Sequence, residues 1–370
     1  MKLEPFALER MQSTWENRVA WNLAESGVHP LRLEELAISA EDRAALFGQE
    51  LGYTQTNGTP ELRLAIAAMY PGAGAEHVNV TNGGSEANLI AVWRLVERGD
   101  EVVMMMPNYM QMRGIARAFG AAVRPWTLIE EDSKWRADLD ALEALVTPAT
   151  RLILICNPNN PTGARLEAGE LDAICRIAGR VGAWVLSDEI YRGAELDGVD
   201  TTSVWGRYDR AIVTSGLSKA FGLPGLRIGW VVAPPPLIEA LWGVHDYTTI
   251  APGALNDRLA RVALARREFV IARTRGIVSA NYPVVKKWID KRAPALSHVA
   301  PEAGAIAFVR YRQPINSTVL VERLRDEHSV LLVPGDHFDM DGHLRIGFGN
   351  HPAYLTSALE LVGDVLDRIT

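Results

Sequence analysis

The sequence has only two cysteines among its 370 residues, Cys156 and Cys175. One lies in an apolar run and the other in a helix-like run, which is typical of buried free thiols rather than of a disulfide or a nucleophile. The chain also lacks an uninterrupted apolar stretch of the length that crosses a membrane. Its first sixteen residues are mixed and charged and lack the apolar core of a secretory signal. We therefore expect a cytoplasmic protein with no membrane partner.

Positive charge is not in excess either. The chain has 38 lysines and arginines against 45 aspartates and glutamates, which gives a net charge of −7. This balance argues against nucleic acid or another polyanion as the main partner. Low-complexity segments and internal repeats are absent, and we expect no bound metal. A chain of this length favours one large domain and a smaller one.

Apolar segments alternate with amphipathic segments over the first two thirds of the chain. The expected strands are 101–106, 151–156, 183–188, 211–216 and 226–233. This alternation predicts an α/β fold with a mostly parallel sheet covered by helices on both faces. After about residue 235 the pattern changes to long helices and then short strands. We assign residues 41–254 to a large domain, and residues 1–40 with 255–370 to a smaller α+β domain.

Unusual polar residues follow three of the expected strands. The segment NPNNPTG (157–163) follows the strand 151–156, Asp188 ends the next strand, and Ser218-Lys219 follows the strand 211–216. A further polar segment, TNGGSE (81–86), precedes an expected helix. Ligands of parallel α/β sheets bind outside the carboxyl ends of the strands, so these residues are expected to surround one site.

Each of these features also has a purely structural interpretation. A single lysine after a strand is commonly a solvated surface residue, and a single aspartate there is commonly a helix cap. The asparagine and proline segment alone could form only a tight turn. Two glycines and a serine before a helix could be a simple cap or a general anion site. Their joint occurrence at strand ends, in this order, favours a functional site.

The most specific segments are LSKAFGLPGLRIG (217–229) and NPNNPTG. With them, the chain resembles the class I/II aminotransferases, a family of fold-type I enzymes that use pyridoxal 5′-phosphate (PLP) and that includes aspartate aminotransferase. The resemblance runs from about Gly27 to Arg345. Closely similar segments occur in family members that do not transfer amino groups.

The resemblance implies a role for each matching residue. Lys219 carries the cofactor as a Schiff base, which a lysine can do because its amine can lose its proton and attack a carbonyl. Asp188 pairs with the pyridine nitrogen and keeps the ring an electron sink. Asn160 and Tyr191 bind the 3′ oxygen of the cofactor, and Tyr109 stacks on its ring.

The same resemblance implies an anion site for the cofactor phosphate. Gly84 and Ser85 offer backbone N–H groups at a helix N-terminus, and Ser218 and Arg227 add a hydroxyl and a bidentate charge. Tyr53 matches a tyrosine that reaches the phosphate of the neighbouring subunit, which implies a homodimer with shared sites; the alternative is a loop aromatic packed on the core. Many relatives have a serine where this chain has Gly216, so Ser215 or a water is expected to supply that hydrogen bond, unless it is lost.

For the substrate, the resemblance implies that Arg345 binds the α-carboxylate. A planar guanidinium suits this role better than the amine of a lysine does. Asn160 also lies where the substrate binds, and Gly27 lies in a segment expected to cover it. His29 is a candidate acid–base group for chemistry beyond Cα; the alternative is that it only stabilises the turn before Pro30.

Aromatic candidates for the side-chain pocket are Trp15, Trp21, Trp126 and Tyr247. No second arginine can be assigned to a dicarboxylate side chain.

These residues predict an aminotransferase that moves the amino group between an L-amino acid and an α-keto acid. The alternative is a PLP enzyme that eliminates, replaces or cyclises at Cβ or Cγ. The segments HDYTTIAPG (245–253) and ESGVHP (25–30) resemble those of capreomycidine synthase-like members, which act on arginine-derived substrates. A regulator would need a DNA-binding module, for which there is no room before residue 27. A protein that binds no cofactor would leave the set of Lys219, Asp188 and Asn160 unexplained.

Overall fold

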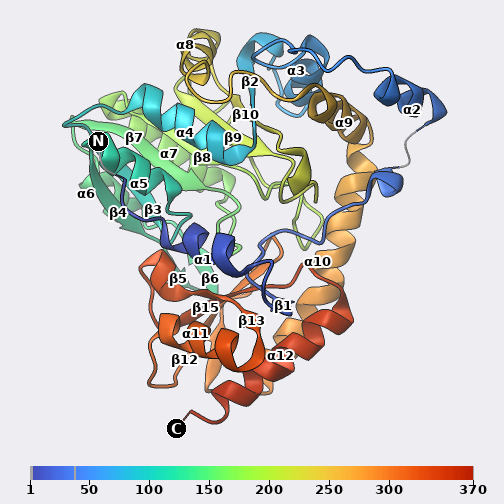
Figure 1. Cartoon of the computed structure of the whole chain (residues 1–370). Coiled ribbons are helices and arrows are strands. Elements are labelled where there is room, and N and C mark those ends of the chain that lie inside the picture. Colours follow the sequence, from blue (N-terminus) through green and yellow to red (C-terminus); the bar gives the residue numbers. More distant parts are fainter. Residues whose placement is uncertain (1–2, 37–38, 370) are drawn as a thin grey trace.

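The computed structural model describes residues 3–36 and 39–369. Its largest sheet has seven strands in the order β2-β10-β9-β8-β7-β3-β4 (Figure 1). Strand β10 runs antiparallel to both β2 and β9, and all other neighbours are parallel. In sheet order the strands are Val78–Thr81, Gly229–Val232, Ala211–Gly216, Trp184–Asp188, Thr150–Cys156, Glu101–Met106 and Ala122–Thr127.

Helices flank this sheet, because strands that are apolar on both faces need cover on both faces. Helix α4 packs on β9 and β10, and α7 packs on β8 and on α6. The predicted fold class is confirmed, with the correction that the segment expected as strand 226–233 forms a shorter antiparallel strand. The helices of this region are α3 Pro60–Ala67, α4 Gly84–Leu95, α5 Gln111–Ala118, α6 Leu139–Leu145, α7 Ala168–Val181 and α8 Pro235–His245.

A second sheet, antiparallel and ordered β11-β12-β15-β14, lies in the C-terminal part. Its strands are Leu296–His298, Ile306–Tyr311, His343–Gly347 and Val333–Pro334. The long helix α10 runs from α9 down the side of this part (Figure 1). The helices here are α9 Ala254–Ala265, α10 Arg267–Asp290, α11 Ser317–His328 and α12 Pro352–Leu366.

The N-terminal segment joins the C-terminal part through backbone pairing. Strand β1 (Trp21–Asn22) pairs in parallel with β13 (Val330–Leu331). Helix α1 (Ala7–Trp15) lies where the two parts meet (Figure 1). The domain boundaries themselves stay a prediction. The remaining elements are α2 Ala40–Phe47, the hairpin β5 Ile129–Glu131 with β6 Lys134–Arg136, and the 3₁₀ helices Leu33–Leu36, Ala75–His77, Pro224–Leu226 and Gly335–Phe338.

Both cysteines are buried free thiols, as predicted. Within residues 3–36 and 39–369, no helix combines the length and apolar character that a membrane crossing needs.

Candidate active site

Three neighbouring strands deliver the polar residues to one cavity of about 260 Å³. Asn160 follows β7, Asp188 ends β8, and Ser218-Lys219 follows β9. Because β7, β8 and β9 are adjacent and parallel, their carboxyl ends meet at one edge of the sheet. The cavity also reaches across to Arg345 on β15 and is closed by residues of α1. The expected convergence is therefore present in the structure.

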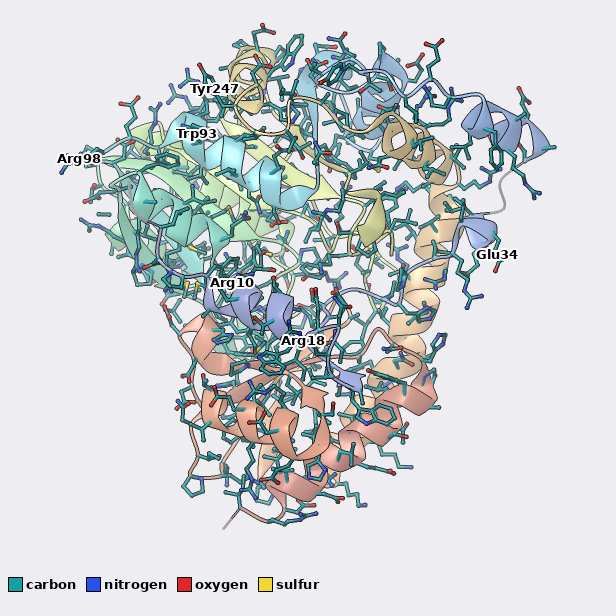
Figure 2. All side chains as sticks on the ribbon, viewed as in Figure 1. Arg10, Arg18, Glu34, Trp93, Arg98 and Tyr247 are labelled. Carbon is teal, nitrogen blue, oxygen red and sulfur yellow. The ribbon has the colours of Figure 1, made fainter. Side chains whose placement is uncertain are left out.

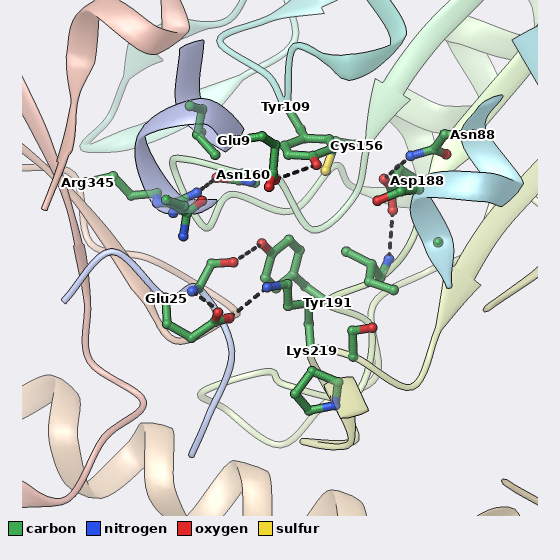
Figure 3. Close-up of a pocket in the computed structure, with 18 of the residues that line it drawn as sticks. Glu9, Glu25, Asn88, Tyr109, Cys156, Asn160, Asp188, Tyr191, Lys219 and Arg345 are labelled. Carbon is green, nitrogen blue, oxygen red and sulfur yellow. Dashed lines mark hydrogen bonds and ion pairs between the residues drawn. The ribbon is translucent and has the colours of Figure 1, made fainter. Parts of the chain in front are cut away.

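The Lys219 amine points into this cavity and contacts a carboxylate (Figure 3). Its Nζ donates to Oε1 of Glu25 at 2.7 Å. Burial disfavours the charged amine, but the charge of Glu25 and its hydrogen bond to Nζ help to outweigh burial and raise the pKa of Lys219. Glu25 therefore holds the free amine as a cation.

Asp188 is a buried carboxylate with few partners. Its Oδ2 accepts from Nδ2 of Asn88 at 3.0 Å and its Oδ1 from the backbone N–H of Ile190 at 3.1 Å. Asn88 is itself oriented by Thr214, whose hydroxyl donates to Oδ1 of Asn88 at 2.6 Å. Burial raises the pKa of Asp188 despite these hydrogen bonds. A cation placed beside Asp188 would restore its ordinary ionisation.

Arg345 is almost fully buried, with 1% of its surface exposed. Its Nη1 donates to Oδ1 of Asn160 at 2.9 Å and its Nη2 to the carbonyl oxygen of Ala24 at 2.5 Å. Its Nε has no hydrogen-bond partner among the described residues. Burial lowers the pKa of Arg345. A buried guanidinium with a donor unused is suited to receive a carboxylate.

The two tyrosines of the cavity are hydrogen-bonded to the N-terminal segment. The hydroxyl of Tyr191 donates to Oγ of Ser26 at 2.9 Å, and that of Tyr109 donates to Oε1 of Glu9 at 2.7 Å. Burial raises the pKa of both hydroxyls, so both remain neutral donors at physiological pH. The segment around α1 and β1 thus forms one wall of the site.

The N-terminus of α4 forms an anion cradle on the other side of the cavity. The N-cap residue Gly83 has a φ of 97° and no side chain to cap the helix, so the N–H groups of Gly84 and Ser85 have no partner among the described residues. A Cβ on Gly83 would lie 2.3 Å from Nη2 of Arg227. Nη1 of Arg227 lies 3.5 Å from Oγ of Ser218. Gly84, Ser85, Ser218 and Arg227 all line the cavity, as the resemblance implied.

The glycine that replaces the family serine has a structural cause. A Cβ on Gly216 would lie 2.8 Å from the carbonyl oxygen of Ile228 on the neighbouring strand. Ser215 does not compensate for the missing hydroxyl, because its Oγ donates to the carbonyl oxygen of Glu189 at 3.2 Å and does not line the cavity. The suggestion that Ser215 reaches the phosphate is therefore corrected.

Three candidates for the cofactor or substrate site, Tyr53, His29 and Gly27, are not among the residues that line this cavity. Tyr53 is 90% exposed and lines a different surface hollow with Leu51 and residues 251–256. His29 lines a neighbouring cavity, and its ring is held by Arg273, with Nη2 to Nδ1 at 2.8 Å, and by stacking on His351. The contacts of its ring favour the turn-stabilising alternative, and a role of His29 towards the substrate stays a prediction. A Cβ on Gly27 would lie 3.4 Å from Cδ of Lys219, so Gly27 does lie over the lysine.

The aromatic candidates for a side-chain pocket do not line the cavity. Trp126 is buried in the core of the sheet, and Trp15 and Trp21 pack on the core. Tyr247 is 80% exposed and lies beside Trp93 on the outer surface (Figure 2). Glu9, Glu25 and Asn88 are among the lining residues to which the sequence did not point. Asn88 carries a signal that could have found it, a polar residue on the buried face of an amphipathic helix.

The residues present fit PLP on chemical grounds. A buried carboxylate whose pKa is raised by burial suits a protonated pyridine nitrogen, and an uncapped helix N-terminus with an arginine suits a phosphate. Lys219 supplies the amine, and Tyr109 supplies an aromatic face in the same cavity. The unused Nε of Arg345 suits the carboxylate of a substrate.

Comparisons with known proteins agree with this site. The family model described as aminotransferase class I and II matches residues 26–362. The chain is 34% identical to a capreomycidine synthase of Streptomyces vinaceus over 93% of this chain and 89% of that protein. A solved PLP-dependent aminotransferase from Streptococcus suis 89-1591 superposes with a TM-score of 0.94 at 35% identity, over 100% of this chain and 99% of that one. A solved PLP-dependent cyclase, OrfR, superposes with a TM-score of 0.89 at 27% identity, covering 100% and 99% of the two chains.

The matched range contains Lys219, Asp188, Asn160, Arg227 and Arg345. The chain therefore belongs to the class I and II aminotransferases, and its cofactor is PLP.

Proposed function

We propose that this enzyme transfers the amino group of an L-amino acid to an α-keto acid. The observation that carries the proposal is the grouping of Lys219, Asp188 and Arg345 around one cavity. When bound, PLP draws electrons away from the Cα of the substrate through its protonated ring. Arg345 lines the cavity and binds the α-carboxylate, which fixes the position of Cα.

The proton transfers of this reaction need one mobile base. The Nζ of Lys219 would take the proton from Cα of the substrate, and the Asp188 carboxylate would keep the ring nitrogen of the cofactor protonated. Asn88 and Thr214 keep the Asp188 carboxylate in place for this task. The Asn160 amide orients Arg345 by accepting its Nη1–H.

A second candidate is elimination, replacement or cyclisation on an amino acid. Such reactions need a further acid–base group. Glu25 is the candidate for this group, because its Oε1 lies 2.7 Å from Nζ of Lys219, whereas His29 lines the neighbouring cavity. The likeness to a capreomycidine synthase and to a PLP-dependent cyclase supports this candidate. Both candidates share the cofactor, Lys219 and Arg345.

Product analysis separates the two candidates. The holoenzyme is incubated with a pool of ¹⁵N-labelled amino acids and unlabelled α-keto acids, and the products are identified by mass spectrometry. Amino transfer predicts ¹⁵N in the amino acid formed from the acceptor. If ¹⁵N appears only in ammonia or in a cyclised amino acid, and Glu25→Gln abolishes that product, the second candidate is the correct one.

We also propose that the enzyme is a homodimer in which Tyr53 completes the phosphate site of its neighbour. The support is the exposure of apolar side chains over residues 47–53, where Phe47, Leu51 and Tyr53 are 94%, 80% and 90% exposed. An apolar surface of this kind commonly marks an interface.

For this dimer we expect Tyr53→Phe to weaken retention of PLP on dialysis. Mixing Tyr53→Phe with Lys219→Ala under exchange conditions is expected to recover activity, because a hybrid dimer has one site with both residues. A fully active monomer in light scattering would exclude this assembly.

A further inference from the structure

Six charged side chains line the cavity around Lys219 within the described part of the chain. Four of them serve the cofactor or the α-carboxylate in the proposed function: Lys219, Asp188, Arg227 and Arg345. The two that remain are both acidic, Glu9 and Glu25. No unassigned cation of the described residues faces the same space. The part of the cavity left for a substrate side chain is therefore negatively charged.

Glu25 is held rigidly with one oxygen unused. Its Oε1 accepts from the backbone N–H groups of Ser26 at 2.9 Å and Gly27 at 2.8 Å, and from Nζ of Lys219. Its Oε2 has no hydrogen-bond partner among the described residues, and 43% of the side chain is exposed. Burial favours the neutral acid, but Lys219 and the backbone hydrogen bond from Gly27 outweigh burial and lower the pKa of Glu25. This carboxylate is therefore charged at neutral pH.

Glu9 approaches the same space from α1. Its Oε1 accepts from the hydroxyl of Tyr109, and its Oε2 has no hydrogen-bond partner in residues 3–36 and 39–369. Figure 3 shows Glu9 and Glu25 towards the Arg345 side of the cavity and Asp188 towards the opposite side. Both carboxylates also act electrostatically on Arg345. A substrate held at Arg345 thus lies close to both of them.

The cavity opens towards a second, larger one that is also acidic. Glu25 and Pro224 line both cavities, and the second has a volume of about 790 Å³. Its lining includes three further glutamates: Glu16, Glu34 and Glu35. Its one guanidinium among the described residues, Arg32, lies 3.6 Å from the carboxylate of Glu34. The approach to the site therefore attracts cations.

The position of a ligand is indicated independently by Arg345. This side chain is almost fully buried, lines the cavity and has an unpartnered Nε, which calls for a carboxylate there. When an amino acid binds with its carboxylate at Arg345 and its amine at Lys219, only its side chain still needs a binding partner. Glu9 and Glu25 are the charged groups available to that side chain.

We propose that the site selects L-amino acids with a cationic side chain, a guanidinium or an amine, and that Glu9 and Glu25 bind this group. This inference rests on the proposed function, because it takes Lys219 and Arg345 as the binding groups for the amino acid. A dicarboxylic substrate meets two like charges and no cation, which disfavours it. A neutral side chain leaves Glu9 without a charged partner and Glu25 with only the amine of Lys219.

The test is equilibrium binding to the holoenzyme, measured by calorimetry and by the absorbance of the bound cofactor. L-Arginine and L-lysine are compared with L-citrulline and L-norleucine, which have similar lengths and no side-chain charge, and with L-glutamate. We expect the cationic amino acids to bind on the order of 100-fold more tightly than the neutral ones. Among acceptors, pyruvate is expected to be used in preference to 2-oxoglutarate.

Two variants and one matched control assign the effect to residues. Glu9→Gln is expected to lower the affinity for arginine about tenfold or more and to keep the affinity for norleucine. Glu25→Gln also loses the ion pair with Lys219, so it is expected to lower the affinity for both amino acids, and that for arginine about tenfold more than that for norleucine. Retained binding of norleucine also shows that the variant is folded. Glu61→Gln makes the same charge change on the exposed side of α3, outside both cavities, and is expected to leave the preference unchanged.

Two outcomes overturn the proposal in distinguishable ways. If norleucine or glutamate binds as tightly as arginine and is converted, the inference about the side chain is wrong and the proposed function stands. If no amino acid changes the absorbance of the bound cofactor, or the chain takes up no PLP, the proposed function fails together with the inference.

Discussion

Lys219→Ala is expected to bind PLP and yet to lose roughly 10⁴-fold or more in turnover, because the nucleophile and the proton-transfer group are removed together. Binding is expected to persist through the anion cradle at α4 and through Asp188, which do not depend on the lysine. Turnover is measured with the amino acid that gives the largest absorbance change in the wild type. PLP content is measured after gel filtration.

Lys286→Ala is the matched control for this variant. Lys286 lies on the exposed side of α10, where it pairs with Asp290, so its loss is expected to leave turnover unchanged. If Lys219→Ala keeps more than a tenth of the wild-type rate, Lys219 is not the catalytic base and the proposed proton transfers are wrong.

Arg345→Lys is expected to lower kcat/KM for amino acids by about 100-fold, because a lysine keeps the charge but loses the planar fork and the hydrogen bond to Asn160. The loss is expected for every type of side chain, since the α-carboxylate is common to all of them. For amines without a carboxylate the loss is expected to be much smaller. The measurement compares kcat/KM for amino acid and amine pairs with the same side chain.

Arg310→Lys serves as the control because Arg310 lies on the adjacent strand β12 with its side chain about half exposed. Its kcat/KM is expected to match that of the wild type. Equal losses for amines and amino acids in Arg345→Lys would show that Arg345 only supports the fold.

Much of the site could be predicted because its residues sit at fixed points of regular elements. The ends of β7, β8 and β9 and the start of α4 place Asn160, Asp188, Lys219 and Ser85 at one edge of the sheet. Apolar strands and helix periodicity are local signals, so the sequence alone locates these ends. The direction of β10 could not be predicted, because a strand of four buried residues carries no signal of its direction.

The wall formed by the N-terminal segment could not be predicted from local pattern. This segment is held by pairing with distant backbone, such as Leu23 N–H to the carbonyl oxygen of Leu331 at 2.9 Å. That pairing turns Glu25 towards Lys219, whereas His29, four residues later, turns towards Arg273 on α10. Sequence proximity to Gly27 therefore did not predict which side chain contacts Lys219.

The central claim is that Lys219 carries PLP as a Schiff base, and reduction tests it most directly. The purified holoenzyme is treated with borohydride, digested and mapped by mass spectrometry. We expect one modified peptide, in which the mass of the reduced cofactor is on Lys219, and a visible absorbance that disappears on reduction. A colourless protein that takes up no PLP, or a cofactor fixed to another lysine, would contradict this claim.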